Sequence, residues 1–295
     1  MIKHFRQTLD FLLFSNLFIA LCAVAQGLVT YQLLHIKPDY YILGLLFFST
    51  LALYNFCILL AKPTNPHESP FKRVRWIFSH HRIIISLTLI AVLSALILAT
   101  FLSLQAQILL AFLGAISVTY SLPIFTLQDK KFGIRNIPGL KLFLIALVWS
   151  ASCVLLPILE LESSQSITIP ARDTLLLIAK RFLFIAAITV PFDIRDLFQD
   201  RDSSLKTIPV LVGEKNSYLV CQGLLITYLV LLFLFTTSFD RNFFGIMLTI
   251  LLTGWLIFKS NWKRDEYYYF LYLDGTMIVQ FLMLLACNWL PIENL

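Results

Sequence analysis

The sequence predicts an all-α, polytopic membrane protein with about nine transmembrane helices, and three observations support this class. The residues are 59% hydrophobic and 14% charged, whereas ordinary globular domains are about 45–50% apolar and about 25% charged. Apolar runs long enough to cross a bilayer recur along nearly the whole chain, and nine spans of about 20 residues leave room only for connecting loops. The basic residues also concentrate in alternate loops. We therefore expect residues 1–295 to form a single integral-membrane domain.

The first predicted span follows Lys3 and Arg6 and continues to about Leu34. Two bases followed by an apolar run resemble a signal peptide, but this run is too long for the apolar region of one. We therefore expect an uncleaved first span. In chain order, the predicted spans cover residues 9–34, 40–61, 82–102, 105–122, 138–159, 171–192, 216–237, 242–259 and 267–290.

The distribution of lysine and arginine predicts the orientation of these spans. Most of the 23 basic residues lie in one set of segments, which comprises the N-terminus, 62–82, 123–141, 193–215 and 259–266. The opposite set holds only Lys37, Arg172 and Arg241. Because cytoplasmic loops are enriched in Lys and Arg, we expect a cytoplasmic N-terminus and an external C-terminus in a cell membrane, plasma or inner. The asymmetry also indicates an odd number of spans.

Several other kinds of function find no support in the sequence. The net charge is +6, but the bases are not gathered in a groove or stripe, so we expect no nucleic-acid partner. The five cysteines lie singly in apolar runs, a pattern that indicates neither a zinc site nor a disulfide framework. No feature points to a protein partner, whereas membrane lipid must surround the chain.

The most informative stretch is the charged segment 191–210, which directly follows a long apolar run. Asp193, Asp196 and Asp200 stand at positions i, i+3 and i+7, so on a continuous helix all three carboxylates project from one face. Three like charges on one face repel one another unless a cation lies between them. Carboxylate oxygens suit a hard cation such as Mg²⁺, which in turn suits a diphosphate. We therefore predict a magnesium site here.

Charged residues inside the predicted spans are the second notable feature. Lys180 and Arg181 lie near the middle of the sixth span, and Asp274 lies inside the ninth. Charges at such depth are rare and face a cavity or a partner. A structural pair between Asp274 and Arg181 or Lys180 is the favoured interpretation. The alternative places Asp274 in a binding pocket, as a base or as a group that orients an acceptor.

The loop 62–82 carries three prolines followed by a basic and aromatic segment, Phe71-Lys72-Arg73-Val74-Arg75-Trp76. The favoured interpretation is an anchor at the membrane interface. The alternative is a lid that adds cations to a phosphate site. Bases after the fourth span, Lys130 and Lys131, are explained equally well by loop charge bias and by phosphate contact.

Three of these features together resemble the UbiA superfamily of intramembrane prenyltransferases. Asp193-x-x-Asp196-x-x-x-Asp200, followed by Lys206-Thr207-Ile208-Pro209-Val210-Leu211-Val212-Gly213, is similar to the second aspartate-rich motif of that family. Tyr120-Ser121-Leu122-Pro123 with its downstream lysines resembles the family's loop after the fourth span, and Asn55 stands where its first motif begins. Nine spans with both motifs on the cytoplasmic side are also the family's layout.

The resemblance implies a helical bundle around a central cavity, in which Mg²⁺ and aspartates bind a prenyl diphosphate. Its ionisation gives an allylic carbocation that attacks a hydrophobic acceptor, such as an aromatic quinone precursor or a tetrapyrrole. Asp193, Asp196 and Asp200 would then be the catalytic and metal-binding residues. The expected substrate-binding residues are Asn55, Lys62, Tyr120, Lys130, Lys131, Arg195, Lys206 and Asp274.

The chain departs from the family pattern in the first motif. After Asn55 the family places acids near the positions of Phe56, Leu59 and Pro63, and this sequence has none there. Three outcomes are open. One metal on the second motif suffices, with Lys62, Lys72, Arg73 or Arg75 supplying the missing charge; the substrate carries no diphosphate; or the protein binds an isoprenoid lipid without turning it over.

Overall fold

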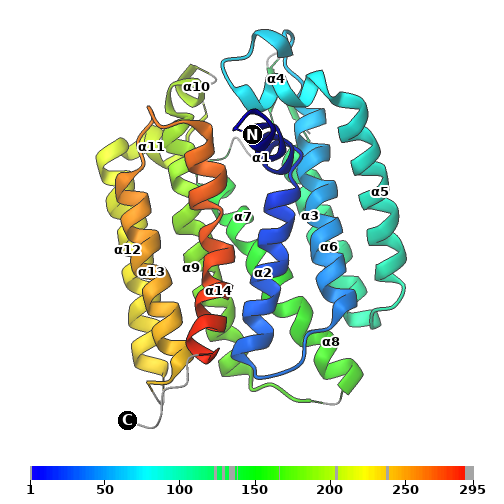
Figure 1. The fold of residues 1–295 in the computed structure, drawn as a ribbon, viewed down its shortest axis with the longest axis vertical. Helices are drawn as coiled ribbons and strands as arrows, with labels where there is room; N and C mark the ends of the chain where they lie inside the picture. The colour runs from blue at the N-terminus through cyan, green and yellow to red at the C-terminus, as the bar shows by residue number, and fades with distance from the viewer. Residues whose placement is uncertain are drawn as a thin grey trace.

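The structure is a computed structural model that describes residues 2–122, 125–127, 130–132, 137, 139–165, 167–202, 205–236 and 239–289. Long helices run side by side in one bundle (Figure 1). The α-helices are α1 (Ile2–Phe14), α2 (Leu17–Leu33), α3 (Tyr40–Leu60), α4 (Lys72–Ser79), α5 (His81–Ala99), α6 (Leu104–Ser121), α7 (Leu140–Ser150), α8 (Leu156–Gln165), α9 (Ala171–Arg195), α10 (Leu197–Asp202), α11 (Ile208–Val212), α12 (Glu214–Phe235), α13 (Arg241–Lys259) and α14 (Thr276–Trp289). The remaining elements are a 3₁₀ turn η1 (Pro66–Glu68), two π-helical segments η3 (Ala151–Leu155) and η4 (Tyr268–Leu273), and a short antiparallel hairpin of β1 (Phe125–Leu127) and β2 (Lys130–Phe132).

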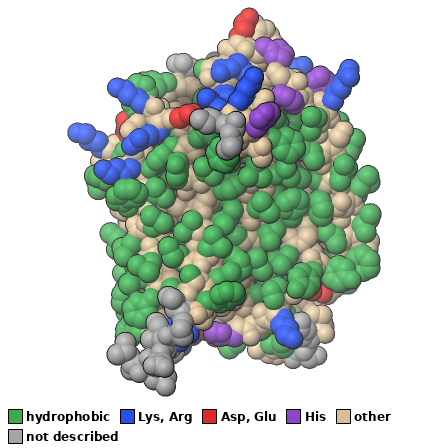
Figure 2. All heavy atoms as spheres, in the orientation of Figure 1, with side chains coloured by type: hydrophobic (Ala, Val, Ile, Leu, Met, Phe, Trp, Pro, Cys, Tyr) green, Lys and Arg blue, Asp and Glu red, His purple; other side chains and the backbone are tan. Residues whose placement is uncertain are grey.

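The outer surface of the bundle is apolar, as a lipid-facing surface must be. Large side chains such as Leu96 and Leu234 are more than half exposed, and Figure 2 shows a broad band of hydrophobic side chains around the middle of the visible face. Lys and Arg side chains gather at the end of the bundle where α1, α4, α10 and α11 lie (Figures 1 and 2). We refer to this end as the basic end. The prediction of a multi-pass, all-helical membrane protein is confirmed.

The number of membrane-crossing helices is less than the predicted nine when judged by length and composition alone. In the described part of the chain, seven helices are long and apolar enough to cross a membrane, and α1 with α2 would make an eighth. The apolar helix at Leu104–Tyr120 is shorter; it occupies the position of the predicted fourth span. The total of nine therefore stays a prediction.

The first predicted span, 9–34, is not a single helix. α1 and α2 are bent by 63° relative to each other, and Asn16 between them adopts a left-handed conformation with φ 66°. Asn tolerates this conformation better than most residues because its short polar side chain can bond locally. Here the side chain bonds to Asn55 of α3 instead, at 2.7 Å. The break thus ties the N-terminal segment to the centre of the bundle.

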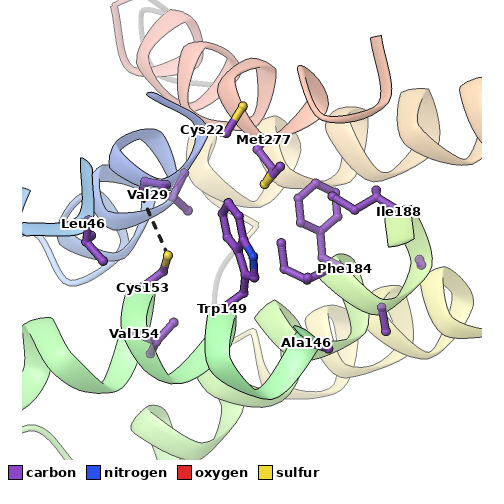
Figure 3. Close-up of a cluster of buried hydrophobic side chains, with 14 of the residues drawn as sticks. Cys22, Val29, Leu46, Ala146, Trp149, Cys153, Val154, Phe184, Ile188 and Met277 are labelled. Carbon is purple, nitrogen blue, oxygen red and sulfur yellow. Dashed lines mark hydrogen bonds between the residues drawn. The ribbon is translucent and has the colours of Figure 1, made fainter. Parts of the chain in front are cut away.

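Close packing of small side chains draws the central helices together. A Cβ added to Gly27 of α2 would lie 2.6 Å from a methyl group of Leu46 on α3, so a larger residue here would force the Leu46 side chain to shift, and glycine allows the close approach of the two helices. Trp149 belongs to the same buried cluster as Phe184 of α9 and Met277 of α14, and its ring lies near the middle of that cluster (Figure 3).

Candidate functional site

A cavity of about 190 Å³ lies at the basic end, inside the helical bundle. Its wall combines apolar side chains with three cations and two carboxylates. The lining residues are Leu13, Asn16, Phe18, Ile19, Tyr54, Arg73, Lys141, Ile145, Thr189, Phe192, Asp193, Arg195, Phe270 and Asp274. They come from α1, α2, α3, α4, α7 and α9, from the turn between α1 and α2, and from η4 with the residue that follows it, so segments from both ends and the middle of the chain meet here.

Arg73 reaches the cavity because α4 is docked across the basic end. The backbone N–H groups of Lys72 and Arg73, on the first turn of α4, donate to the carboxylate of Glu266. A carboxylate at a helix N-terminus satisfies amides that have no partner within the helix. The Arg73 guanidinium then donates to the side-chain oxygen of Asn16 and lies 4.7 Å from the centre of the Phe270 ring. Burial, together with the repulsion of the nearby Arg195, lowers the pKa of Arg73 to about 10, so it stays cationic at neutral pH.

The other bases of the predicted lid segment point elsewhere. Lys72 forms an ion pair with Asp10 of α1 at 2.8 Å and also bonds to Tyr267. Arg75 donates to the backbone carbonyls of Ser69 and Pro70. Lys62 is exposed and lies 5.9 Å from the Phe78 ring. Of the four bases considered for this role, Arg73 is the one that lines the cavity, and the placement of α4 favours a lid over a simple interfacial anchor.

Arg195 forms the second cationic wall. Its guanidinium is held among aromatic rings of Phe71, Phe192, Tyr269 and Phe270, with centroid distances of 5.3–5.6 Å. Contacts of this kind are attractive because the ring face carries negative charge. The same guanidinium makes two hydrogen bonds to Asp196, at 2.8 and 3.0 Å. Arg195 is therefore rigidly placed before any ligand arrives.

Lys141 is the third cation, and its partner is Asp193. The two side chains form an ion pair, and the Asp193 side chain is only 2% exposed. Lys141 also interacts electrostatically with Asp200. Burial raises the pKa of the Asp200 carboxyl, and Lys141 opposes that shift. One ammonium group thus serves two carboxylates of the motif.

The prediction that one continuous helix carries the three aspartates is corrected, because the helix is interrupted at Asp196. α9 ends at Arg195, Asp196 is its C-terminal cap, and α10 starts a new helix at Leu197. The i, i+3, i+7 argument requires a continuous helix, so it does not hold across this break. Within the described ranges, no group of three acidic, histidine or cysteine side chains is placed to hold a metal ion. Asp193 pairs with Lys141, and the carboxylates of Asp193, Asp196 and Asp200 lie near enough to interact electrostatically.

The predicted pair between Asp274 and Arg181 or Lys180 is wrong. Among the described residues no ion pair joins them, and the Arg181 guanidinium donates instead to the hydroxyl of Thr30 at 3.2 Å. Asp274 lines the cavity together with Arg73 and Arg195. It directly follows the π-helical segment η4, a helix irregularity that is frequent at functional sites. The alternative interpretation, with Asp274 in a pocket, agrees with its position.

The remaining predicted substrate-binding residues have varied positions. Asn55 is fully buried and accepts the hydrogen bond from Asn16, so it supports the cavity wall without lining it. Tyr120 lines a neighbouring apolar chamber, whereas Lys206 is exposed and outside the cavity lining. Lys130 and Lys131 lie on β2 of the short hairpin, and their side chains fall outside the described part of the structure.

The apolar chamber has a volume of about 510 Å³ and lies between α3, α5, α6 and α7. Its wall includes aliphatic and small side chains of these four helices and extends from Tyr120 and Cys57 to Leu45 and Ala99. Tyr54 and Ile145 line both this chamber and the polar cavity. The polar cavity and the apolar chamber therefore adjoin at those two side chains.

Sequence reasoning missed the contributions of Lys141, Asn16 and Tyr54. Lys141 carried one available signal, because it lies on the first turn of an apolar helix, where the helix dipole disfavours a cation. A base at that position indicates a nearby acid. Asn16 and Tyr54 gave no such signal, since polar residues within spans are adequately explained by bonds between helices.

Comparisons with known proteins give a result only at the level of structure. Neither the family models nor the curated proteins compared with this sequence show a match. Among solved structures, a UbiA homolog from Archaeoglobus fulgidus bound to GPP and Mg²⁺ is similar with a TM-score of 0.66 and 13% identity, over 95% of this chain and 100% of that one. An apo UbiA homolog from Aeropyrum pernix K1 has a TM-score of 0.61 and 14% identity, over 94% and 96% of the two chains. A structure described as digeranylgeranylglyceryl phosphate synthase in membranes has a TM-score of 0.56 and 12% identity, over 95% and 98%.

These identities are too low to carry anything beyond architecture, but the overlap covers nearly the whole of each chain. The similarity confirms the helical membrane bundle that the sequence predicted. This chain has the fold of the UbiA superfamily.

Proposed function

We propose that this protein binds a prenyl diphosphate and transfers its prenyl group to a lipid-soluble acceptor within the membrane. The observation that carries the proposal is the junction of the two compartments at Tyr54 and Ile145. A prenyl diphosphate has one strongly anionic end and one apolar end. The cationic cavity suits the first and the apolar chamber suits the second.

The cavity has the charge and the rigidity that diphosphate binding needs. Arg73 and Arg195 present guanidinium groups, which match phosphate oxygens with paired N–H donors. Both are fixed by neighbouring contacts, so binding costs little ordering of side chains. Solved structures of similar fold are described as UbiA homologs bound to GPP or to DMAPP with Mg²⁺, which supports this class of ligand for the present chain.

A single Mg²⁺ fits the donor set at Asp193 and Asp200. Mg²⁺ is commonly held by one or two carboxylates together with substrate phosphates, and the positive charge of Lys141 already interacts with both of these carboxylates. When bound there, the ion would neutralise charge that develops on the departing diphosphate. Asp196 is a weaker ligand candidate, because both of its oxygens are engaged by Arg195.

Arg73 takes over the electrostatic role of the missing acidic motif after Asn55. Asn55 bonds to Asn16, and Asn16 in turn accepts from Arg73. A guanidinium therefore stands over the part of the cavity that adjoins α3, where the chain has no acids to hold a second cation. In this proposal the protein's own charge stabilises the diphosphate that leaves.

The transfer itself breaks the bond between the prenyl C1 atom and the diphosphate oxygen, and the diphosphate keeps the electron pair. A nucleophilic atom of the acceptor then bonds to C1 and releases a proton. The Asp274 carboxylate lines the cavity and can accept that proton. The apolar walls, among them Phe192 and Phe270, keep water from the allylic cation.

The proposal also includes the orientation of the chain in the membrane. The basic end carries most of the loop bases, so it faces the cytoplasm by the positive-inside rule. Under this proposal the N-terminus is cytoplasmic, the C-terminus is outside and the cavity mouth faces a soluble pool of prenyl diphosphates. Cysteine-accessibility labelling of single-cysteine variants at Lys206 and Lys37 tests the assignment.

The test of activity uses purified protein, Mg²⁺ and radiolabelled prenyl diphosphates of several lengths, with a membrane lipid extract as the source of acceptor. Release of diphosphate with formation of a labelled lipid supports transfer. Binding without diphosphate release supports the second candidate, an isoprenoid-binding protein without turnover. The absence of acids after Asn55 and the neutralisation of Asp193 by Lys141 favour that candidate. No binding of any prenyl diphosphate would contradict both.

A further inference from the structure

A second polar site lies away from the cavity described above, around Arg181 in the middle of α9. Arg181 is ten residues from the start of α9 and fourteen from its end, or about 15 and 21 Å at 1.5 Å per residue. The side chain is only 5% exposed. Charges at this depth in a bilayer are costly unless they have a partner.

The partners of Arg181 do not balance its charge. One terminal nitrogen donates to the Thr30 hydroxyl at 3.2 Å, and the other, Nη1, is buried with no hydrogen-bond partner among the described residues. Among the described residues, no carboxylate forms an ion pair with Arg181 or with the adjacent Lys180. The acid that acts on Lys180 is Asp173, which lies about two turns away on the same helix.

A small cavity adjoins the Arg181 side chain. Apart from Lys180 and Arg181, its polar lining consists of the hydroxyl of Tyr228 and the amide of Gln280, and the rest of the wall is apolar. Gln280 is further fixed by Gln26, which donates to its side-chain oxygen at 3.2 Å. Four side chains that can donate hydrogen bonds, two of them cationic, therefore surround one space without a carboxylate in its lining.

The size of the space limits the ligand to a single atom or a water molecule. The cavity has a volume of about 10 Å³, at the lower limit of the about 10–15 Å³ that one water needs. A chloride ion is slightly larger than a water molecule and enters with a small outward shift of the lining side chains, whereas a phosphate or a carboxylate group needs a much larger movement of the walls. The two positive charges favour an anion over water, because an anion offsets the free-energy cost of holding two unpaired cations inside the membrane.

We infer that this cavity is a binding site for a chloride-sized monovalent anion, held by Arg181 and Lys180 between α2, α9, α12 and α14. The anion receives hydrogen bonds from Arg181 Nη1, from the Lys180 ammonium and from the Tyr228 hydroxyl. Its role is to stabilise the contact of these four helices within the membrane. The site is separate from the residues proposed to bind diphosphate, and it stands whether or not the protein is a transferase.

The test measures the thermal unfolding temperature, Tm, of the purified full-length protein in a neutral detergent. Sodium chloride replaces sodium gluconate at constant total sodium, so that only the small anion changes. We expect Tm to rise along a saturating curve, by about 4 °C at ten times the dissociation constant. Bromide should act in the same way, and crystals grown in bromide should show an anomalous peak beside Arg181.

Two substitutions locate the effect. Arg181→Gln should abolish the chloride dependence of Tm, whereas Arg172→Gln should leave it unchanged. Arg172 is a matched control because it lies on the same helix and carries the same charge but is exposed. Lys180→Gln, a second variant in case Arg181→Gln does not fold, should raise the half-saturating chloride concentration about threefold.

The inference is overturned by any of three results. The first is an unaltered protein with the same Tm in chloride and gluconate, which would leave water as the occupant. The second is an equal loss of chloride dependence in Arg172→Gln and Arg181→Gln. The third is bromide density elsewhere with none beside Arg181.

Discussion

Replacing Arg73 by Gln is the sharpest test of the proposed diphosphate site. This substitution removes one positive charge from the cavity while keeping a side chain that can still bond to Asn16. Arg75→Gln is its matched control, because Arg75 lies on the same short helix but bonds to the backbone carbonyls of Ser69 and Pro70, outside the cavity lining. Both variants change the net charge of α4 equally.

The expected magnitude follows from the contacts. A hydrogen bond to a charged group contributes about 1.5–3 kcal/mol, which corresponds to a factor of about 10 to 150 in Kd. Loss of Arg73 also leaves Asp274 with one opposing guanidinium instead of two, and this makes the cavity less attractive to an anion. We therefore expect Arg73→Gln to weaken binding at least tenfold and Arg75→Gln to change it less than twofold.

The assay is equilibrium binding of geranyl diphosphate, measured by calorimetry in detergent with the Tm of each variant as a check of folding. The salt dependence of the affinity gives a second readout. Removal of a cation that contacts phosphate makes the affinity fall less steeply as the salt concentration rises. Equal affinities for the two variants, with both proteins folded, would refute the assignment of the diphosphate to this cavity.

Three further predictions concern the metal pair, the proton acceptor and the apolar chamber. Lys141→Met leaves the carboxylate of Asp193 buried without its cation, so it should destabilise the protein by about 3 kcal/mol. Added Mg²⁺ should restore the lost Tm. A Tm that Mg²⁺ does not restore would argue against a metal at Asp193 and Asp200. Asp274→Asn should bind the prenyl diphosphate normally but slow product formation at least about 100-fold, and normal turnover would remove Asp274 from the chemistry. Gly114 lines the chamber with no atom within 4 Å of an added Cβ, so Gly114→Leu should select against long prenyl chains, with Gly223→Leu, equally open but outside the chamber lining, as the control. An unchanged chain-length profile in Gly114→Leu would show that the tail lies elsewhere.

Much of the architecture was predictable because it depends on quantities that are local in sequence. Apolar run length predicts spans, and loop charge predicts which ends lie together, so the motif around Asp193 and the segment carrying Arg73 were expected at one end of the bundle. The UbiA-like fold was expected from the resemblance of the segment around Asp193 to a motif of that family. Depth along a helix was also predictable, because each residue advances the helix by about 1.5 Å.

Two expectations at the site failed because each depended on something that local spacing does not contain. The shared face of Asp193, Asp196 and Asp200 required a continuous helix, but the chain turns at Asp196, where its carboxylate binds the guanidinium of Arg195. The pair between Arg181 and Asp274 was inferred from the depths of the two residues in the membrane. Their helices present these side chains to different cavities.

By itself, then, the sequence determined the membrane class of this protein, the end of the bundle that carries charge and the residues available for chemistry there. Only the tertiary structure decided which of them meet: Arg73 with Asn16 and Asn55, Lys141 with Asp193, and Asp274 with the two arginines. The physical reason is that helices in a bilayer are apolar on the faces they turn to lipid as well as on those they bury. Their periodicity therefore does not reveal which face turns inward, and the rotation of each helix is set by close packing with its neighbours.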